Sequence, residues 1–212
     1  MKSPLAEQER DRLIEAMLPD VAFDGWSRAA LHVAARTAGL PADEAEALFA
    51  SGPPDMVAAF SRWADRRMLE RYEAAPPQSV STGARVKRAL ALRFEAMQPW
   101  REAVRRALAV LALPPHALLG TRLVYETVDA IWYASGDAST DFSFYTKRAT
   151  LAGVYGATLL FWLDDRSAGL ADTLAFIDRR LADIARLGEA RTRLEEALRR
   201  LPNPLRLLRP VR

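Results

Sequence analysis

The chain has 212 residues, half of them hydrophobic, so it can bury one sizeable core, and two large independent domains are not expected. Thirty basic residues against 27 acidic ones leave a net charge of only +3, which by itself does not indicate a nucleic-acid partner. The absence of cysteine excludes disulfides, thiolate nucleophiles and thiolate metal ligands.

Two segments bear on localisation. The N-terminal stretch MKSPLAEQERDRLIEAML lacks the apolar core of a signal peptide and is too acidic for a typical mitochondrial transit peptide. Residues 149–163, ATLAGVYGATLLFWL, are fewer than the roughly 20 residues that a membrane-spanning helix needs, and charges lie at both ends. We therefore expect a cytoplasmic protein without a targeting peptide, in which the apolar run is a buried helix.

The hydrophobic pattern is helical throughout. Apolar positions repeat every three or four residues, and alternating runs rich in valine and isoleucine are missing. Glycine and proline divide this pattern into about nine or ten helices. The sequence predicts an all-α bundle in three parts: residues 1–75, residues 76–189, and a basic C-terminal helix and tail over residues 190–212.

The first part has the order of a helix-turn-helix followed by a connecting helix, as in tetracycline-repressor-type regulators. Its first helix is expected from about Glu9 to Phe23. Its second helix is expected to begin at Ser27, whose side chain can cap the free amides. The third helix, PADEAEALFA, carries Asp43, Glu44 and Glu46 and no cation. Because these carboxylates would repel the DNA backbone, we expect a degenerate module with no nucleic-acid partner. A working ligand-responsive transcriptional regulator is the alternative.

No catalytic constellation is evident. His32 and His116 are the two histidines, neither has an evident partner, and packed or surface histidines are commoner than catalytic ones. Phosphate-binding glycine loops, di-iron Glu-x-x-His pairs and the Gly-x-Ser-x-Gly elbow are absent. Asp129, Asp137 and Asp141 do not have the spacing of a calcium loop. We predict a non-enzymatic protein without metal or cofactor.

Residues 130–156, AIWYASGDASTDFSFYTKRATLAGVYG, are the most unusual stretch. Ser139 or Thr140 can cap the helix that follows, and Asp141 would interact favourably with its dipole. Beyond the turn, Phe144, Tyr145 and Arg148 share one helical face. Aromatic residues with arginine are typical of interface hot spots, although packing against neighbouring helices explains them equally well.

This stretch resembles the Coq-nine family, the lipid-binding accessory proteins of ubiquinone biosynthesis. The similarity rests on Trp132 and on the runs SGD, STDF, YTKR and ATLAGVY at 135–137, 139–142, 145–148 and 149–155, with Ser143 and Phe144 where the family has asparagine and tryptophan. The resemblance implies a homodimeric tetracycline-repressor-like fold that no longer acts on DNA. It also implies a lipid cavity and delivery of an isoprenoid quinone intermediate to the demethoxyubiquinone hydroxylase. The family's partner-binding patch corresponds to Asp141, Phe144, Tyr145 and Arg148.

The helix after the turn is apolar almost all round and contains Gly153 and Gly156. These glycines allow either close helix packing or open space for a ligand. If a lipid cavity is present, we expect it to be lined by Val128, Leu151, Val154, Tyr155 and Leu159.

Gly188 is expected to separate the last helix from the helix before it. The C-terminal segment that follows combines an apolar stripe with many arginines. Basic amphipathic helices of this kind lie in anionic membrane interfaces, while packing on the protein's own body is the alternative. The Coq-nine family uses its last helix to reach the membrane, so the resemblance implies that this protein binds peripherally at the inner face of the membrane. The predicted membrane-binding residues are Arg191, Leu194, Leu198, Leu201, Leu205, Arg206, Leu208 and Arg209.

Overall fold

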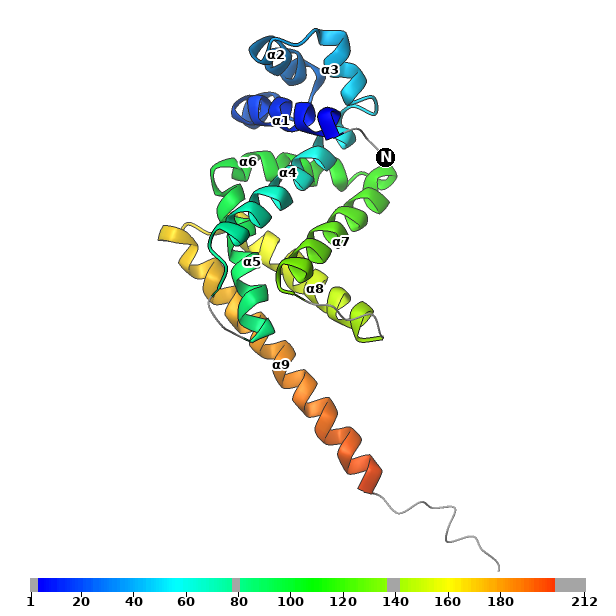
Figure 1. Ribbon diagram of the computed structural model, residues 1–212, viewed down its shortest axis with the longest axis vertical. Helices are drawn as coiled ribbons and strands as arrows, with labels where there is room; N and C mark the ends of the chain where they lie inside the picture. The colour runs from blue at the N-terminus through cyan, green and yellow to red at the C-terminus, as the bar shows by residue number, and fades with distance from the viewer. Residues whose placement is uncertain (1–3, 78–80, 137–141, 201–212) are drawn as a thin grey trace, which may run out of the picture.

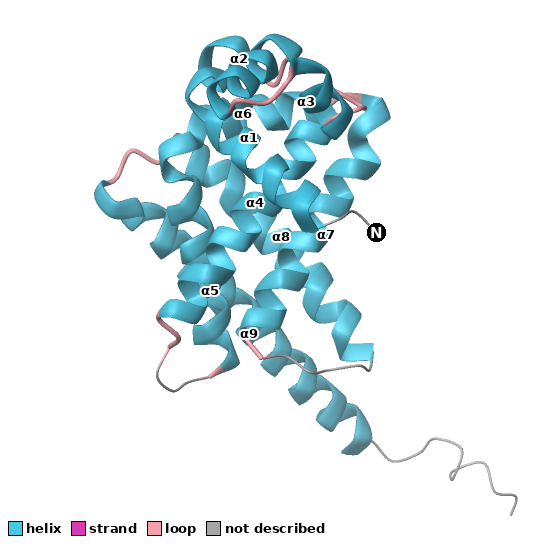
Figure 2. Ribbon diagram, turned by 45° about the horizontal axis from the view of Figure 1, so that its top comes forward, coloured by secondary structure: helices cyan, strands magenta, loops and turns pink. Residues whose placement is uncertain are grey.

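The computed structural model describes residues 4–77, 81–136 and 142–200 of the chain. Within these ranges the protein consists of helices joined by loops and has no strand (Figure 2), which confirms the predicted all-α class. The described α-helices are α1 (Pro4–Asp24), α2 (Arg28–Ala38), α3 (Ala42–Leu48), α4 (Pro53–Ala74), α5 (Thr82–Met97), α6 (Arg101–Leu111), α7 (Ala117–Ala134), α8 (Phe142–Asp164) and α9 (Ala171–Arg200). Three single-turn 3-10 helices are η1 (Gln98–Trp100), η2 (Pro114–His116) and η3 (Ala168–Leu170).

Helices α1 to α3 form one end of the molecule (Figure 1). The predicted cap of α2 is present, because the Ser27 hydroxyl accepts a hydrogen bond from the Ala30 amide at 3.2 Å. Gly39 ends α2 in the left-handed conformation with φ +71°, which glycine adopts without steric cost. The Trp26 indole donates to the carbonyl of Ala103 at 3.0 Å, which ties this end to α6.

Helix α4 connects this end to the rest of the bundle, since it packs against α1, α5, α6 and α7. A single cluster of buried hydrophobic residues extends from Leu13 on α1 to Ile177 on α9. The parts predicted as residues 1–75 and 76–189 therefore share one hydrophobic core.

Two helix boundaries differ from the predicted ones. Helix α1 begins at Pro4 instead of about Glu9, because proline is favourable in the first turn and Glu7 interacts well with the helix dipole. Helix α9 is a single helix of 30 residues that passes through Gly188, where the sequence predicted a break between two helices. A glycine inside a helix costs about 1 kcal/mol relative to alanine, which the surrounding alanine, leucine, glutamate and arginine residues offset. Figure 1 shows that α9 extends well beyond the other helices.

Asp165 holds the junction between α8 and α9. One carboxylate oxygen accepts hydrogen bonds from the Ser167 amide at 2.7 Å and the Ser167 hydroxyl at 2.6 Å. The other accepts from the amide of Thr173 at 3.0 Å and from its hydroxyl. Burial alone would raise the pKa of Asp165, but these hydrogen bonds outweigh it and lower the pKa to about 2.

Candidate functional site

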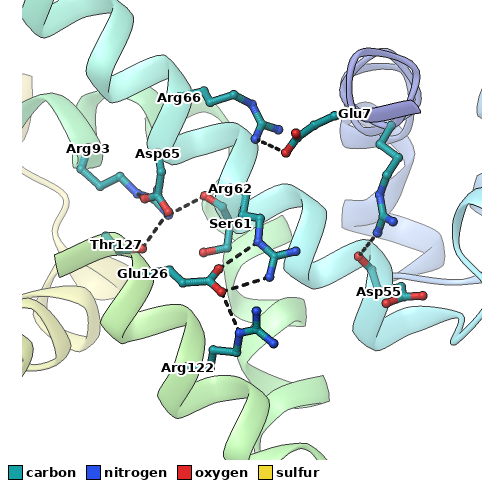
Figure 3. Close-up of polar contacts among 11 residues, drawn as sticks. Glu7, Asp55, Ser61, Arg62, Asp65, Arg66, Arg93, Arg122, Glu126 and Thr127 are labelled. Carbon is teal, nitrogen blue, oxygen red and sulfur yellow. Dashed lines mark hydrogen bonds and ion pairs between the residues drawn. The ribbon is translucent and has the colours of Figure 1, made fainter. Parts of the chain in front are cut away.

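A buried ion pair lies at the centre of the bundle, where α4, α5 and α7 meet. Arg93 Nε donates to Asp65 Oδ1 at 2.8 Å, and the Thr127 hydroxyl donates to Asp65 Oδ2 at 3.1 Å. Asp65 thus lies between Arg93 and Thr127 (Figure 3). The sequence analysis missed this pair, although a charged residue inside the apolar run ALALRFEAM is a signal that points to Arg93.

Both members of the pair are removed from water, with 2% of Arg93 and 7% of Asp65 exposed. Burial raises the pKa of Asp65, because the loss of hydration outweighs the attraction of Arg93 and the Thr127 hydrogen bond. Burial alone would lower the pKa of Arg93, but Tyr155 and Asp65 outweigh it and raise that pKa, so the guanidinium remains charged. Each charge compensates the other, and removal of either side chain would leave an uncompensated charge in the core.

A second set of ion pairs surrounds this centre and fastens α4 to α7. Glu126 accepts from Arg62 Nε at 2.8 Å and from Arg122 Nε at 2.8 Å, and Figure 3 shows it between the two arginines. Burial opposes the ionisation of Glu126, but these two hydrogen bonds lower its pKa. Arg62 and Glu126 are partly exposed and Arg122 is mostly exposed, so these ion pairs contribute little to stability.

A core cavity lies beside the buried pair, between α4, α5, α6, α7 and α8. It encloses about 70 Å³, or about 490 Å³ when its open mouth is counted. Tyr155 and Leu159, two of the predicted lipid-binding residues, line this cavity together with Arg93 and Thr127. The apolar part of the wall includes Phe60, Met97, Val104, Leu108 and Leu123.

A larger groove of about 330 Å³ lies between α5, α7, α8 and α9, and we call it the α5–α9 groove. Leu151, a third predicted lipid-binding residue, lines it. Its other apolar walls are Val86 on α5, Trp132 on α7, and Leu181 and Ile184 on α9. Lys147 also borders the groove, with its ammonium 5.6 Å from the centre of the Trp132 ring.

The five predicted lipid-binding residues therefore do not line one cavity. Tyr155 and Leu159 belong to the core cavity, and Leu151 belongs to the α5–α9 groove. Val128 and Val154 are buried, with 0% and 6% exposed, and line neither of these two spaces.

The predicted docking patch is partly assembled on the first turns of α8. Tyr145 is 67% exposed, and its ring meets the half-buried ring of Phe144 edge-on, with the centroids 5.2 Å apart. Arg148 is only 5% exposed; its guanidinium lies 3.4 Å from the centre of the Phe144 ring and donates to Asp129 on α7 at 2.8 Å. Among the patch residues that the structure describes, Tyr145 is therefore the most accessible to a partner, whereas Arg148 is buried between Phe144 and Asp129.

The predicted caps Ser139 and Thr140, and the patch residue Asp141, lie outside the described residues. The two glycines of α8 are described, and a side-chain carbon built on Gly153 or Gly156 would meet no atom within 4 Å. Neither glycine is needed for close packing within the described chain. They lie on the same stretch of α8 as Leu160, which is 65% exposed.

Both histidines have partners that the sequence did not reveal. His32 Nε2 lies 2.7 Å from Glu46 of α3, and His116 Nδ1 lies 2.9 Å from the Val110 carbonyl. The pairing leaves Asp43 and Glu44 as exposed acids on α3. Within residues 4–77, 81–136 and 142–200, no three acidic or histidine side chains form a group that could hold a metal ion.

The predicted membrane-binding residues divide at the end of α9. Arg191, Leu194 and Leu198 lie on the last turns of this helix, while Leu201, Leu205, Arg206, Leu208 and Arg209 lie outside the described residues. Among the described helices, none is both long and apolar enough to cross a membrane alone; Thr82–Leu111 together with Pro114–Ala134, bent by 101°, meets that criterion by length and composition only.

Comparison with known proteins relates part of the chain to a family. Residues 117–188 match the COQ9 family model. The chain carries a COQ9 family domain. It is 32% identical over 190 residues to the rat "Ubiquinone biosynthesis protein COQ9, mitochondrial", covering 86% of this chain and 60% of the relative. The human protein of the same name is 31% identical over 190 residues, with 86% and 59% covered. The chain thus spans about 60% of the length of these COQ9 relatives.

A solved structure supports the fold. The TetR transcriptional regulator from Nitrosomonas europaea ATCC 19718 superposes with a TM-score of 0.67 at 21% identity, covering 84% of this chain and 98% of the regulator. The expected tetracycline-repressor-like fold and the resemblance to the COQ9 family are both confirmed. Of the residues that line the α5–α9 groove, all but Gly83 and Val86 fall inside the COQ9 domain.

Proposed function

We propose that this protein acts in ubiquinone biosynthesis as a non-enzymatic lipid-binding accessory protein. In this proposal it takes an isoprenoid quinone intermediate from a membrane surface and presents it to the demethoxyubiquinone hydroxylase. The COQ9 relatives, whose names place them in ubiquinone biosynthesis, support the pathway. The observation that carries the binding step is the α5–α9 groove, whose 330 Å³ is within the range of about 300–1,000 Å³ typical of ligand pockets.

Helix α8 is shared by the groove and the proposed docking patch. Lys147 and Leu151 of α8 line the groove, while Tyr145, two residues before Lys147, is largely exposed. Because successive residues of a helix are about 100° apart around its axis, Tyr145 lies on the side of α8 away from the groove. In this proposal the hydroxylase docks on one side of α8 while the lipid lies on the other side of the same helix.

The position of α9 supports uptake from a membrane. Leu181 and Ile184 of α9 form one wall of the groove, and the same helix continues as far as Arg200. Residues 190–212 place leucines among arginines, a composition suited to an anionic lipid interface. We propose that this segment binds the inner face of the membrane and that lipid moves along α9 into the groove.

The exposed face of α8 supports a homodimer. Leu160 is 65% exposed, and the space over Gly153 and Gly156 is open, so a second helix can approach the α8 backbone closely. An exposed apolar residue beside two glycines on one helix is the arrangement that a helix-to-helix contact between two copies would bury.

Mass spectrometry of lipids extracted from the purified protein tests the binding step. Ala185→Arg places a long charged side chain in the α5–α9 groove, and Ala175→Arg is the matched control because Ala175 is also exposed on α9 and does not line the groove. We expect an isoprenoid quinone in the wild type and in Ala175→Arg, and its loss in Ala185→Arg. If the wild type carries no isoprenoid, or if Ala185→Arg retains it, the groove is not the lipid site.

The alternative function is that of a transcriptional regulator. The fold is consistent with this function, but the acidic surface of α3 does not favour DNA binding. Asp43 and Glu44 are exposed and Glu46 is paired with His32, so α3 offers no cation to a phosphate backbone. Fluorescence anisotropy with a random DNA duplex at low salt separates the two functions. Salt-sensitive binding at micromolar protein concentration would favour the regulator, and no binding would favour the carrier.

A further inference from the structure

A buried arginine without an ion-pair partner lies where α1 meets the start of α4. Arg10 is 6% exposed, and its Nη2 donates to the Asp55 carbonyl at 3.2 Å. Its guanidinium also lies 4.7 Å from the centre of the Phe49 ring. Both contacts are with neutral groups, and no carboxylate of the described residues forms an ion pair with Arg10. The charge of Arg10 is therefore buried without a counter-charge in direct contact, which is unfavourable.

The charges near Arg10 do not remove this cost. Burial is the main cause that lowers the pKa of Arg10; the negative charge of Asp55 opposes it, and the positive charge of Arg62 adds to it. The Asp55 carboxylate is already used, because its Oδ2 accepts a hydrogen bond from the Ser51 amide at 2.9 Å. An anion placed between Arg10 and Arg62 would attract both guanidiniums and offset their mutual repulsion.

A small cleft between α1 and α4 provides room for such an anion. It encloses about 30 Å³, or about 280 Å³ when its open mouth is counted. A water-sized group needs about 10–15 Å³ of such space, so the enclosed part has room for about two oxygen atoms. The residues that line the cleft are Glu7, Arg10, Asp11, Ala59, Arg62 and Arg66.

Two of the three arginines that line the cleft already have acidic partners. Arg66 Nε donates to Asp11 at 2.9 Å. Arg62 Nε donates to Glu126 of α7 at 2.8 Å (Figure 3). Within the described residues, Arg10 is thus the arginine of the cleft whose charge is left for a ligand.

The other side chains of the cleft restrict the ligand to a small anion with one charge. Glu7 and Asp11 also line the cleft, and their carboxylates would repel a dianion such as phosphate more strongly than a monoanion. A planar guanidinium can donate two parallel hydrogen bonds to a carboxylate, a geometry that a spherical chloride ion does not match. The chemistry of the cleft therefore favours a monocarboxylate.

We propose that the cleft between α1 and α4 binds a small monocarboxylate, whose oxygens accept hydrogen bonds from Arg10 and whose charge is also attracted by Arg62. The bound carboxylate supplies the counter-charge that Arg10 lacks and connects α1 to α4. This site shares no lining residue with the core cavity or with the α5–α9 groove. It is therefore independent of the proposed carrier function.

Three probes test the ligand class. Acetate and acetamide have nearly the same shape, but only acetate is charged, and chloride is charged without the planar shape. Each is titrated into ¹⁵N-labelled protein, the two anions as sodium salts at equal ionic strength, and the side-chain Nε–Hε signal of Arg10 is followed. We expect a saturable shift with acetate, and at least about tenfold weaker binding of chloride and acetamide. No saturable shift with acetate, or equal binding of chloride, would overturn the proposal.

Thermal unfolding with matched variants locates the site. Because a ligand of the folded state stabilises it, acetate should raise the melting temperature of the wild type above its value in chloride at equal ionic strength. Arg10→Met should abolish this difference, whereas Arg12→Met, which removes an exposed arginine of the same helix, should retain it. Loss of the difference in both variants would assign it to net charge. Its retention in Arg10→Met would show that acetate binds elsewhere.

A second variant keeps the test decisive if Arg10→Met does not fold. The Glu7 side chain is 51% exposed, and Arg66 keeps Asp11 as a partner when Glu7 is changed. Glu7→Gln removes a negative charge from the cleft and should tighten acetate binding at Arg10 at least about threefold. Glu9→Gln removes an exposed acid of α1 that does not line the cleft and should leave the affinity as in the wild type. Unchanged or weaker binding to Glu7→Gln would overturn the proposal.

Discussion

Replacing Arg93 by methionine while Asp65 remains should lower the free energy of unfolding by about 3–5 kcal/mol, because it leaves a carboxylate without its counter-charge in the core. The two side chains are 2% and 7% exposed, and their charged atoms lie 2.8 Å apart. At an effective dielectric constant of about 20, two unit charges at this distance attract by about 6 kcal/mol. The desolvation of both groups offsets much of this attraction, but the desolvation cost of Asp65 persists when Arg93 is removed.

The double variant Asp65→Leu/Arg93→Met is the decisive comparison. With both charges replaced by apolar groups, stability should return to within about 1 kcal/mol of the wild type or exceed it. Urea unfolding monitored by circular dichroism gives all the free energies needed for a double-mutant cycle. We expect a coupling energy of at least about 3 kcal/mol between the two positions. If Arg93→Met costs less than about 1 kcal/mol, or if the two single losses simply add, the reasoning is refuted.

The pH dependence of the single variant provides an independent check. Burial already raises the pKa of Asp65 in the wild type, and loss of Arg93 should raise that pKa further. A carboxyl group whose pKa is raised on folding destabilises the protein as pH rises through that pKa. Arg93→Met should therefore be closer to wild-type stability at pH 5 than at pH 8. Equal destabilisation at both pH values would contradict a buried, uncompensated carboxylate.

Three further predictions concern α8 and its ends. Asp165 has a pKa of about 2 against an ordinary value of 3.8, so it contributes about 2 kcal/mol of stability that is present above pH 4 and lost as pH falls from 4 to 2. The stability difference between wild type and Asp165→Asn should accordingly shrink from pH 5 to pH 2 in thermal unfolding. Tyr145→Ala should weaken binding to the purified hydroxylase at least about tenfold in surface plasmon resonance, with the melting temperature unchanged. Leu160→Arg should convert a dimer to a monomer in light scattering, because the charge would be buried between two copies.

Matched controls sharpen these tests. Tyr133→Ala removes a tyrosine that is 75% exposed on α7, and it should leave hydroxylase binding as in the wild type. Leu118→Arg changes a leucine that is 85% exposed at the start of α7, and it should leave the oligomeric state unchanged. A loss of hydroxylase binding in both tyrosine variants would assign the contact to a wider surface than the patch at Tyr145. A Leu160→Arg protein with the mass of the wild type would place the dimer contact elsewhere.

The sequence by itself determined the helical class, the cap of α2 and the resemblance to the COQ9 family. Helix periodicity and the Ser27 cap depend on residues close together in the chain, so they can be read without knowledge of the fold. The family signal likewise lies in a continuous irregular stretch around Trp132. The break expected at Gly188 failed because the propensity of a whole helix outweighs one glycine.

Only the tertiary structure decided how side chains from different helices meet. Asp65 and Arg93 are 28 positions apart, and His32 and Glu46 are 14 apart, so their pairing depends on how each helix is rotated and placed against its neighbours. The same rotation buries Arg148, which the sequence grouped with the exposed Tyr145, and turns Tyr155 and Leu151 of one helix toward two different spaces. The spacing of hydrophobic residues in the sequence indicates that a helix has an apolar face. The packing of several helices decides which part of that face borders a cavity.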